Sequence, residues 1–546
     1  MNYRKYLWAL AFMPGLLMAQ DYKVPVSEAD EPMMTGRFEP TWESLMQYQV
    51  PDWFRDAKFG IWAHWGPQCV EGSGDWMARS LYIEDSREYK HHVENYGHPS
   101  EVGFKDILPR FKAEKWNADS LVALYKKIGA RYFFALGNHH DNFDLWDSKY
   151  QEWNSQAIGP KRDILAEWAE ACRKNDMPFG VSLHADHAWS WYETARRYDR
   201  KGDKAGVPYD GRMTKADGKG KWWEGLDPQK LYAQDHPDSY GTWADGMIHR
   251  QWAWGDGVAL PTQDYVTNFY NRTLDVINRY DPDLLYFDVT GVPFYPISDA
   301  GLKIATHFYN HNLDSRHGDF SAVMFGKILD EQQKQALVWD VERGAPNNIP
   351  EQPWQTCTCI GGWHYNDDIY RNGSYKSAGQ VVKMLADVVS KNGNLLLSIP
   401  LRADGTFDEK EAEIIDGIGE WMAVNGEAIY ATRPWSIFGE GPIAGSDIKL
   451  NAQGFNEGAY TVATAQEIRF TQTPKHLYAI ALAWPDDNVV TVKSLAEGSS
   501  LHKKRIRSVE LLGYGKVPFR RTAEGLTVSL PADAPRSVAP VLRIRK

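Results

Sequence analysis

The stretch that decides the fold is residues 280–291, which read YDPDLLYFDVTG. An Asp-Pro loop leads into four consecutive apolar residues, 284–287, and Asp288 follows them directly. A strand that is apolar on both faces is typical of a parallel sheet or barrel. A carboxylate at its end is costly to bury unless it is paired or catalytic, and barrel active sites lie at that end. Asp288 is therefore the first candidate for a catalytic residue. A helix N-cap or a hydrogen-bonded structural role is the alternative.

Segments on either side of this stretch alternate between strand and helix patterns. The alternation predicts a parallel α/β fold, specifically a (β/α)8-like (TIM-type) barrel. A long loop rich in Gly, Lys, Asp and Trp, residues 193–260, interrupts the rhythm and is expected on the strand-end face. The predicted strands are 53–64, 131–136, 179–183, 284–287, 322–328, 354–363 and 395–400, and the predicted helices are 117–130, 163–175, 264–280, 377–390 and 409–424.

The pattern changes after residue 432. Short alternating segments separated by turns follow, at 475–482, 488–493, 507–512 and 526–530. They predict a C-terminal antiparallel β-sandwich. The 546 residues are enough for two or three domains. The predicted division is a leader over 1–20, a catalytic barrel over 21–435 and the β-sandwich over 436–546.

Residues 1–20 have the features of a secretory signal peptide. Arg4 and Lys5 precede a short apolar run, and small or neutral residues follow near residue 19. Export is therefore expected, to the periplasm or by secretion. The run is short for a membrane span, and a retained N-terminal anchor is the alternative. After removal of the signal peptide no membrane contact is expected.

Composition excludes some partners and suggests others. The net charge of −11 argues against a nucleic-acid partner, which would need a basic face. Aromatic residues make up 13% of the chain, with 23 Trp, which suits either stacking on sugar rings or an aromatic core. The cysteines form no disulfide framework and are expected to be free thiols: Cys69, Cys172, Cys357 and Cys359.

Polar residues gather just after the predicted strands. Neutral imidazoles donate and accept hydrogen bonds, which suits the hydroxyl groups of a sugar. The same residue types bind zinc or iron, which is the alternative use. The chain has no His-Glu-x-x-His helix or other spacing that defines a metal geometry, so neither a metal nor another cofactor is expected. The strand-end residues are His64, His139, His140, His184, Asp186 and Asp288.

Several motifs carry a resemblance to a known family. They closely resemble the signatures of the α-L-fucosidases, family 29 of the glycoside hydrolases, and span roughly residues 50–440. The strand before Asp288 is similar to that family's nucleophile strand. The motifs are FGIWAHWGP at 59–67, NHHDNF at 138–143 with WDS at 146–148, SKNGNLLL at 390–397 and NGEAIY at 425–430.

The resemblance implies a retaining exo-glycosidase that removes terminal α-L-fucose from oligosaccharides or glycoconjugates. In such enzymes two carboxyl groups lie about 5–5.5 Å apart, one as nucleophile and one as acid/base. Asp288 matches the nucleophile. Asp75 falls where the family has an acidic residue at the sugar, although a loop-turn residue is the alternative reading. The other residues expected at the sugar are His64, Trp76, His139, His140, His184 and Tyr286.

The family places its acid/base on variable segments, so its position is inferred from the residues. Glu342, in the sequence WDVERG at 339–344, is the choice because partial burial raises the pKa of a carboxyl group. Asp340 and Glu351 are the rival candidates. An ordinary ion pair between Glu342 and Arg343 is the non-catalytic alternative.

Two departures from the family bear on the sugar. Tyr286 stands where the family commonly has Trp, and residues 182–186, SLHAD, stand where many members have a Tyr-rich segment. An α-L-galactosidase, or an enzyme for a related L-sugar, is therefore an alternative, since a hydrophobic pocket rejects one extra hydroxyl only modestly. The alternatives from other classes are a metal-dependent hydrolase that uses the histidines and a glycan-binding protein without activity.

Overall fold

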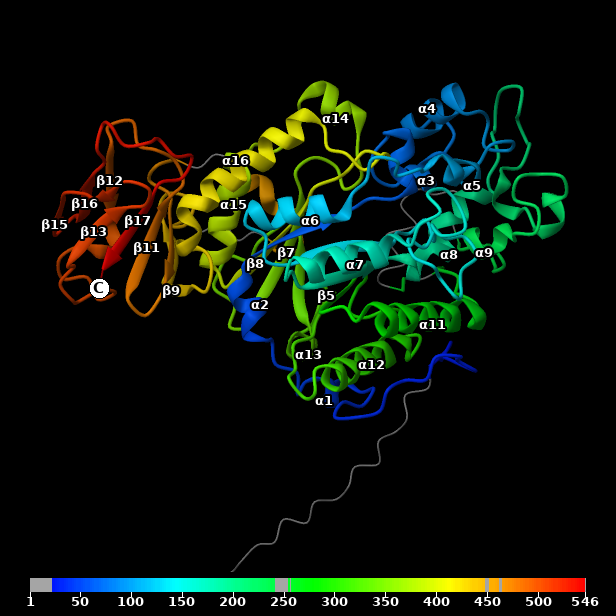
Figure 1. Cartoon of the computed structure of the whole chain (residues 1–546), viewed down its shortest axis with the longest axis horizontal. Helices are drawn as coiled ribbons and strands as arrows, with labels where there is room; N and C mark the ends of the chain where they lie inside the picture. The colour runs from blue at the N-terminus through cyan, green and yellow to red at the C-terminus, as the bar shows by residue number, and fades with distance from the viewer. Residues whose placement is uncertain (1–21, 241–253, 256, 447–450, 461–463, 546) are drawn as a thin grey trace, which may run out of the picture.

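The computed structural model describes residues 22–240, 254–255, 257–446, 451–460 and 464–545. Eight parallel strands close into a barrel, and antiparallel sheets follow, so the predicted fold class is confirmed. The barrel lies beside the C-terminal sheets, which are at the left of Figure 1. The predicted signal peptide, 1–20, lies outside the described residues. Among the described residues, no helix combines the length and apolar character needed to span a bilayer.

Each barrel strand pairs in parallel with the next, and the last pairs with the first. Two predicted strands, 179–183 and 284–287, have the bounds found in the structure. The strands are β1 (Phe59–Ala63), β2 (Phe133–Asn138), β3 (Phe179–Leu183), β4 (Leu284–Phe287), β5 (Val323–Lys327), β6 (Val338–Glu342), β7 (Trp354–Cys359) and β8 (Gly393–Ser398).

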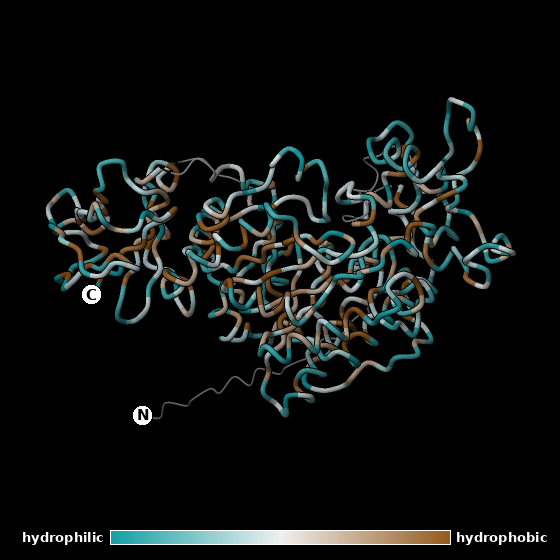
Figure 2. Tube along the Cα trace, turned by 45° about the horizontal axis from the view of Figure 1, so that its top comes forward, coloured by the Kyte–Doolittle hydropathy of each residue, from teal (hydrophilic) through white to brown (hydrophobic). Residues whose placement is uncertain are grey.

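The interior of the barrel is filled with aromatic side chains. The rings of Trp62 and Tyr286 meet edge to face at 4.7 Å, and those of Phe134 and Phe325 meet at 5.7 Å. Space is tight enough to require glycine on β3: a Cβ on Gly180 would lie 2.6 Å from the Phe134 ring. Figure 2 shows the hydrophobic segments gathered in this central region. The floor of any site at the strand ends is therefore rigid and aromatic.

Helices cover the outside of the barrel. Asn117, Asp163 and Ser377 cap their helices by accepting backbone N–H bonds, as expected from polar residues ahead of an apolar pattern. The longer helices are α4 (Arg87–Asn95), α6 (Ala118–Lys127), α7 (Ile164–Lys174), α11 (Gln263–Tyr280), α12 (Ala300–Ser315), α15 (Ala378–Ser390) and α16 (Glu409–Asn425). The shorter ones are α1 (Trp42–Leu45), α2 (Asp52–Ala57), α3 (Met77–Ser80), α5 (Phe104–Ile107), α8 (Ala188–Trp191), α9 (Pro228–Tyr232), α13 (Gln333–Ala336) and α14 (Asp367–Asn372).

The C-terminal region forms a six-stranded and a three-stranded antiparallel sheet. It is tied to the barrel by buried Arg469, which donates to Asp387 on α15 at 2.6 Å. The predicted boundary at residue 435 falls within β9. The strands are β9 (Arg433–Glu440), β10 (Ile468–Gln472), β11 (His476–Ala481), β12 (Val489–Val492), β13 (Ser508–Leu511), β14 (Gly515–Lys516), β15 (Phe519–Thr522), β16 (Gly525–Ser529) and β17 (Val541–Arg545).

Two local predictions were wrong. The first strand begins at Phe59 rather than Trp53, because 52–57 form helix α2 with Pro51 at its N-cap. The segment predicted as one long loop, 193–260, contains α9 and short 3-10 turns in its described part. Buried Asp210 holds this segment to Lys105 and Tyr82, each at 2.7 Å. Tertiary hydrogen bonds of this kind leave no periodic pattern in the sequence.

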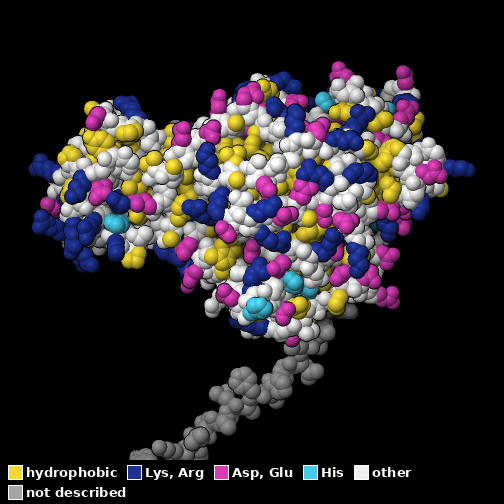
Figure 3. All heavy atoms as spheres, viewed as in Figure 1, with side chains coloured by type: hydrophobic (Ala, Val, Ile, Leu, Met, Phe, Trp, Pro, Cys, Tyr) yellow, Lys and Arg dark blue, Asp and Glu magenta, His cyan; other side chains and the backbone are white. Residues whose placement is uncertain are grey.

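The four cysteines are free and buried, as expected. On the face seen in Figure 3, acidic and basic side chains are intermixed over the barrel, and Lys and Arg gather at the outer end of the C-terminal sheets.

Candidate active site

A cavity of about 370 Å³ opens at the carboxyl ends of the barrel strands. Its size is that of a small-molecule site. Of the nine residues predicted at the site, all except His140 line it. The lining residues are Trp62, His64, Asp75, Trp76, His139, His184, Tyr286, Asp288, Val289, Thr290, Lys327, Ile328, Glu342, Cys357, Trp363, Gln453 and Phe455.

Asp288 follows β4 directly and lies between a lysine and two histidines. One carboxylate oxygen contacts Lys327 Nζ, and the other lies 3.3 Å from His140 Nε2 and 3.9 Å from His184 Nδ1. Burial by itself would raise the pKa of Asp288, but the Lys327 ammonium and the His140 hydrogen bond outweigh it and hold the pKa well below its usual value. The carboxylate is therefore ionised, as a nucleophile must be.

Lys327 joins the two candidate catalytic carboxyl groups. It is the last residue of β5, and its Nζ contacts Asp288 Oδ1 and lies 2.7 Å from Glu342 Oε2. Burial opposes its charge, but Asp288 first and Glu342 second raise the pKa of Lys327 well above its usual value. Sequence reasoning missed this residue. The available signal was a lysine at the end of a predicted apolar strand, where a cation is costly to bury without partners.

Glu342 is placed in the cavity, whereas its rivals are not. Asp340 is two residues earlier on β6 and lies fully buried one layer deeper, where it accepts from Tyr286 at 3.2 Å. Burial raises the pKa of Asp340 to about 6. Glu351 lines a different groove, beside the starts of β6 and β7. Arg343 pairs with Glu457 at 2.7 Å instead of with Glu342.

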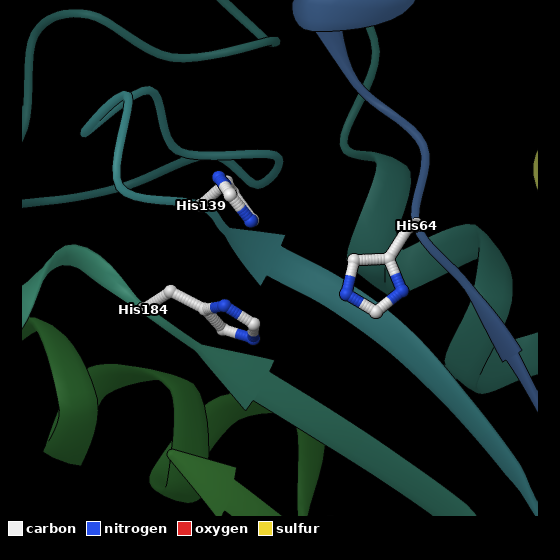
Figure 4. A group of neighbouring side chains, drawn as sticks. All are labelled: His64, His139 and His184. Carbon is white, nitrogen blue, oxygen red and sulfur yellow. The ribbon is translucent and has the colours of Figure 1, made fainter. Parts of the chain in front are cut away.

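Three histidines converge on the cavity from neighbouring strand ends: His64 after β1, His139 after β2 and His184 after β3 (Figure 4). Each is buried, and burial together with neighbouring histidines lowers all three pKa values well below the usual range. The rings are therefore neutral, and each can both donate and accept.

Hydrogen bonds to neighbouring side chains hold two of these rings in place. His64 Nδ1 lies 3.0 Å from Ser398 Oγ, and His139 Nδ1 lies 2.9 Å from Gln68 Nε2. Neither ring nitrogen of His184 has a hydrogen-bond partner among the described residues. Buried polar atoms are normally satisfied, so His184 is poised for a polar ligand in the cavity.

His140 takes a different position from the one predicted. It lies fully buried behind the cavity, where its Nδ1 donates to the His184 carbonyl oxygen at 2.8 Å and its Nε2 faces Asp288. This arrangement suits orienting the carboxylate rather than contacting a sugar hydroxyl.

Asp75 and Trp76 form one wall of the cavity. Asp75 Oδ1 lies 2.8 Å from His364 Nδ1 and 3.7 Å from His139 Nε2, so its carboxylate is oriented by two imidazoles. Trp76 has a φ of 61°, a left-handed conformation that is rare for a bulky residue and is often found at functional sites. His364 was not predicted, because it joins Asp75 from a segment almost 300 residues away.

Tyr286 forms part of the cavity floor. Its hydroxyl donates down into the barrel, to Asp340, and its ring packs against Trp62. Tyr286 therefore presents an aromatic ring to the cavity, while its hydroxyl points away from it.

The histidines could also hold a metal ion. The ligand nitrogens of His64, His139 and His184 lie within 4.8 Å of one another. Three neutral imidazoles plus one open position make up a known catalytic zinc site. The burial that keeps these rings neutral serves a metal as well as a sugar.

Comparison with known proteins agrees with the geometry. Residues 26–427 match the family model described as alpha-L-fucosidase, and 462–545 match the alpha-L-fucosidase C-terminal domain. Rattus norvegicus tissue alpha-L-fucosidase is 23% identical, with 97% of this chain and 95% of the relative covered. Homo sapiens plasma alpha-L-fucosidase is 26% identical, with 91% and 89% covered. The crystal structure of Thermotoga maritima alpha-fucosidase superposes with a TM-score of 0.65 at 25% identity, covering 93% of this chain and 100% of that one.

Proposed function

The chain belongs to the α-L-fucosidase family of glycoside hydrolases, and on this premise we propose that it releases terminal α-L-fucosyl residues from glycans with retention of configuration. Asp288 is the nucleophile and Glu342 the acid/base. The substrate is a fucosylated oligosaccharide or glycoconjugate.

The observation that carries this proposal is the contact of both carboxyl groups with one ammonium nitrogen, Lys327 Nζ. The two carboxyl oxygens that contact Lys327 Nζ can therefore lie at most about two hydrogen-bond lengths, roughly 6 Å, from each other. That span fits the roughly 5–5.5 Å of retaining glycosidases better than the roughly 6.5–9.5 Å of inverting ones, which need room for a water.

The geometry supports the following sequence of steps. Asp288 attacks the anomeric carbon while Glu342 gives its proton to the departing glycosidic oxygen, forming a glycosyl ester on Asp288. Glu342 then takes a proton from water, which attacks the anomeric carbon and releases fucose and free Asp288. Negative charge passes from Asp288 to Glu342 and back, and Lys327 is in contact with both throughout. His64, His139, His184 and Asp75 hold the sugar hydroxyls.

Asp288→Gly tests the assignment. Hydrolysis of an aryl α-L-fucoside should fall to background, and added azide should restore cleavage with a glycosyl azide as product, because azide can occupy the space of the missing carboxylate. Asp264→Asn, at an exposed position on α11, is the control and should behave as wild type. Ordinary turnover by the glycine variant without azide would rule out Asp288 as nucleophile.

The proposed function also concerns which L-sugar the enzyme prefers. L-Galactose differs from L-fucose by one hydroxyl at C6, and one such difference in an apolar pocket is worth about 1–3 kcal/mol. We therefore expect aryl α-L-galactosides to be cleaved, at a lower kcat/KM than the fucosides. The basic start and apolar run within residues 1–20 support export, to the periplasm or by secretion. Detection of a shortened mature chain outside the cytoplasm would test this.

A metal-dependent hydrolase is the second candidate, favoured by the three converging imidazoles. Dialysis against a chelator separates the two. The glycosidase keeps full activity after dialysis, whereas a metal enzyme loses it and regains it on addition of zinc.

A further inference from the structure

A segment beyond the barrel reaches back to the mouth of the active site. Residues 451–458 lie between the two stretches that match family models, 26–427 and 462–545. Gln453 Nε2 donates to the Asp340 carbonyl oxygen at 3.3 Å. Asn456 exchanges two hydrogen bonds with the backbone of Ala345, both at 3.0 Å. The segment is thereby attached both to β6 and to the connection that follows Glu342.

Ion pairs strengthen this attachment. Glu457 pairs with Arg343 at 2.7 Å and with Lys376 at 3.1 Å, and it accepts from Thr358 Oγ1 at 2.6 Å. Glu457 itself is only 9% exposed, so these contacts are largely shielded from water. The segment between Gln453 and Glu457 is therefore held at a defined position beside the catalytic carboxyl groups.

Phe455 lies in the middle of this held segment with its side chain uncovered. It is 59% exposed and adopts a left-handed φ of 50°. Its ring lines the catalytic cavity and also a second cavity of about 260 Å³. The other residues of that second cavity are Arg343, Lys376, Gln380, Met384, Glu457 and Gly458. Phe455 is thus a shared wall between the two cavities.

The position of Phe455 relative to Glu342 indicates what it would bind. Both residues line the catalytic cavity, and Glu342 is proposed to protonate the departing oxygen. In the proposed function the fucosyl ring binds among the buried histidines, which places the leaving sugar toward exposed Phe455. An exposed aromatic face with polar groups beyond it suits a sugar ring, which has apolar faces and a hydroxylated edge.

We propose that Phe455 is the platform of a leaving-group subsite, on which the sugar next to the fucosyl residue stacks, with the following sugar in the second cavity. This inference rests on the proposed function, since it specifies the substrate as an oligosaccharide of at least three sugars. Phe455 is then a specificity-determining residue supplied from outside the barrel.

The test compares two substrates with and without a leaving sugar. One is a fucosylated trisaccharide, and the other is α-L-fucosyl fluoride, whose leaving group is too small to reach Phe455. Phe455→Ala should lower kcat/KM for the trisaccharide about tenfold, the lower end for loss of one pocket contact. It should leave fluoride hydrolysis unchanged. Phe455→Tyr, which keeps an aromatic face, should restore the trisaccharide rate.

The control is Phe519→Ala, which removes another exposed phenylalanine, 37% exposed on β15 outside both cavities. It should change neither rate. Equal losses of kcat/KM on both substrates for Phe455→Ala would overturn the proposed subsite. No loss on either substrate would also overturn it. Failure of the wild-type protein to hydrolyse the fluoride would instead overturn the proposed function.

Discussion

Replacing Lys327 with methionine would test whether one ammonium group serves both catalytic carboxyl groups. Before reaction, Lys327 balances the charge of Asp288. In the proposed mechanism, negative charge develops on Glu342 as it gives up its proton, and the same ammonium, 2.7 Å away, balances that charge. The variant therefore removes an interaction with charge that develops in the transition state.

The magnitude follows from burial. The side chains of Lys327, Asp288 and Glu342 are 12%, 21% and 23% exposed. Removing one preorganised group that stabilises charge developing in the transition state costs about 2.7–4 kcal/mol. Because water reaches a fifth of each carboxyl group, we take the lower end, about 3 kcal/mol, which corresponds to a loss of about 100-fold in kcat/KM.

The pH profile provides a second readout. Burial raises the pKa of Asp288, and Lys327 is the main group that lowers it. Without Lys327 the pKa of Asp288 rises, so the carboxylate becomes protonated at a higher pH than in the wild type. The acid limb of kcat/KM should therefore move to higher pH in Lys327→Met.

The assay is kcat/KM for an aryl α-L-fucoside, measured from acidic to neutral pH, with thermal unfolding to verify the fold. Lys327→Arg keeps a cation and should retain the wild-type acid limb. Lys303→Met removes a lysine paired with Asp299 at 2.7 Å on α12, away from the cavity, and should change nothing kinetically. A Lys327→Met enzyme with wild-type kcat/KM and an unmoved acid limb would refute the reasoning.

Three further predictions follow from the same structure. Glu342→Gln should reduce oligosaccharide hydrolysis by about 10²–10⁴-fold, as for loss of a general acid, yet still give a burst of fluoride from fucosyl fluoride; the same burst-only behaviour in Asp340→Asn would contradict the choice of Glu342. KM for a fucoside, measured by steady-state kinetics, should stay constant as pH falls through the usual histidine pKa of about 6.5. The reason is that burial keeps the pKa of His184 well below that value. A rise in KM near that pH would count against a neutral His184. Arg469→Met should destabilise the fold by about 3 kcal/mol, because it removes one of the two cations that pair with buried Asp387 and the arginine that pairs with buried Glu467. It should lower Tm, whereas Arg520→Met, exposed on β15, should not.

Local patterns in the sequence predicted most of the barrel. The strands 179–183 and 284–287 were recognisable because short, mostly apolar runs are buried on both faces of a parallel strand. Helix starts at Asn117 and Asp163 followed from capping chemistry, which acts over three residues. The helix at 52–57 was missed, since it is too short to show a helical period.

The site was predicted to the extent that its residues follow strand ends. His64, His139, His184 and Asp288 each come directly after a strand, and parallel strands bring their carboxyl ends together at one edge. That local rule located them without knowledge of their partners.

Only the tertiary structure decided which residues far apart in the sequence contact one another. Lys327 meets both carboxyl groups because β4, β5 and β6 are neighbours in the closed barrel. Phe455 reaches the cavity from more than 100 residues further along the chain than Glu342. Periodicity reports which side of its own element a residue occupies, but ion pairs and shared cavities depend on the packing of different elements against one another. Asp288, the proposed nucleophile, could therefore be singled out from residues 280–291 alone, whereas its contact with Lys327 could not.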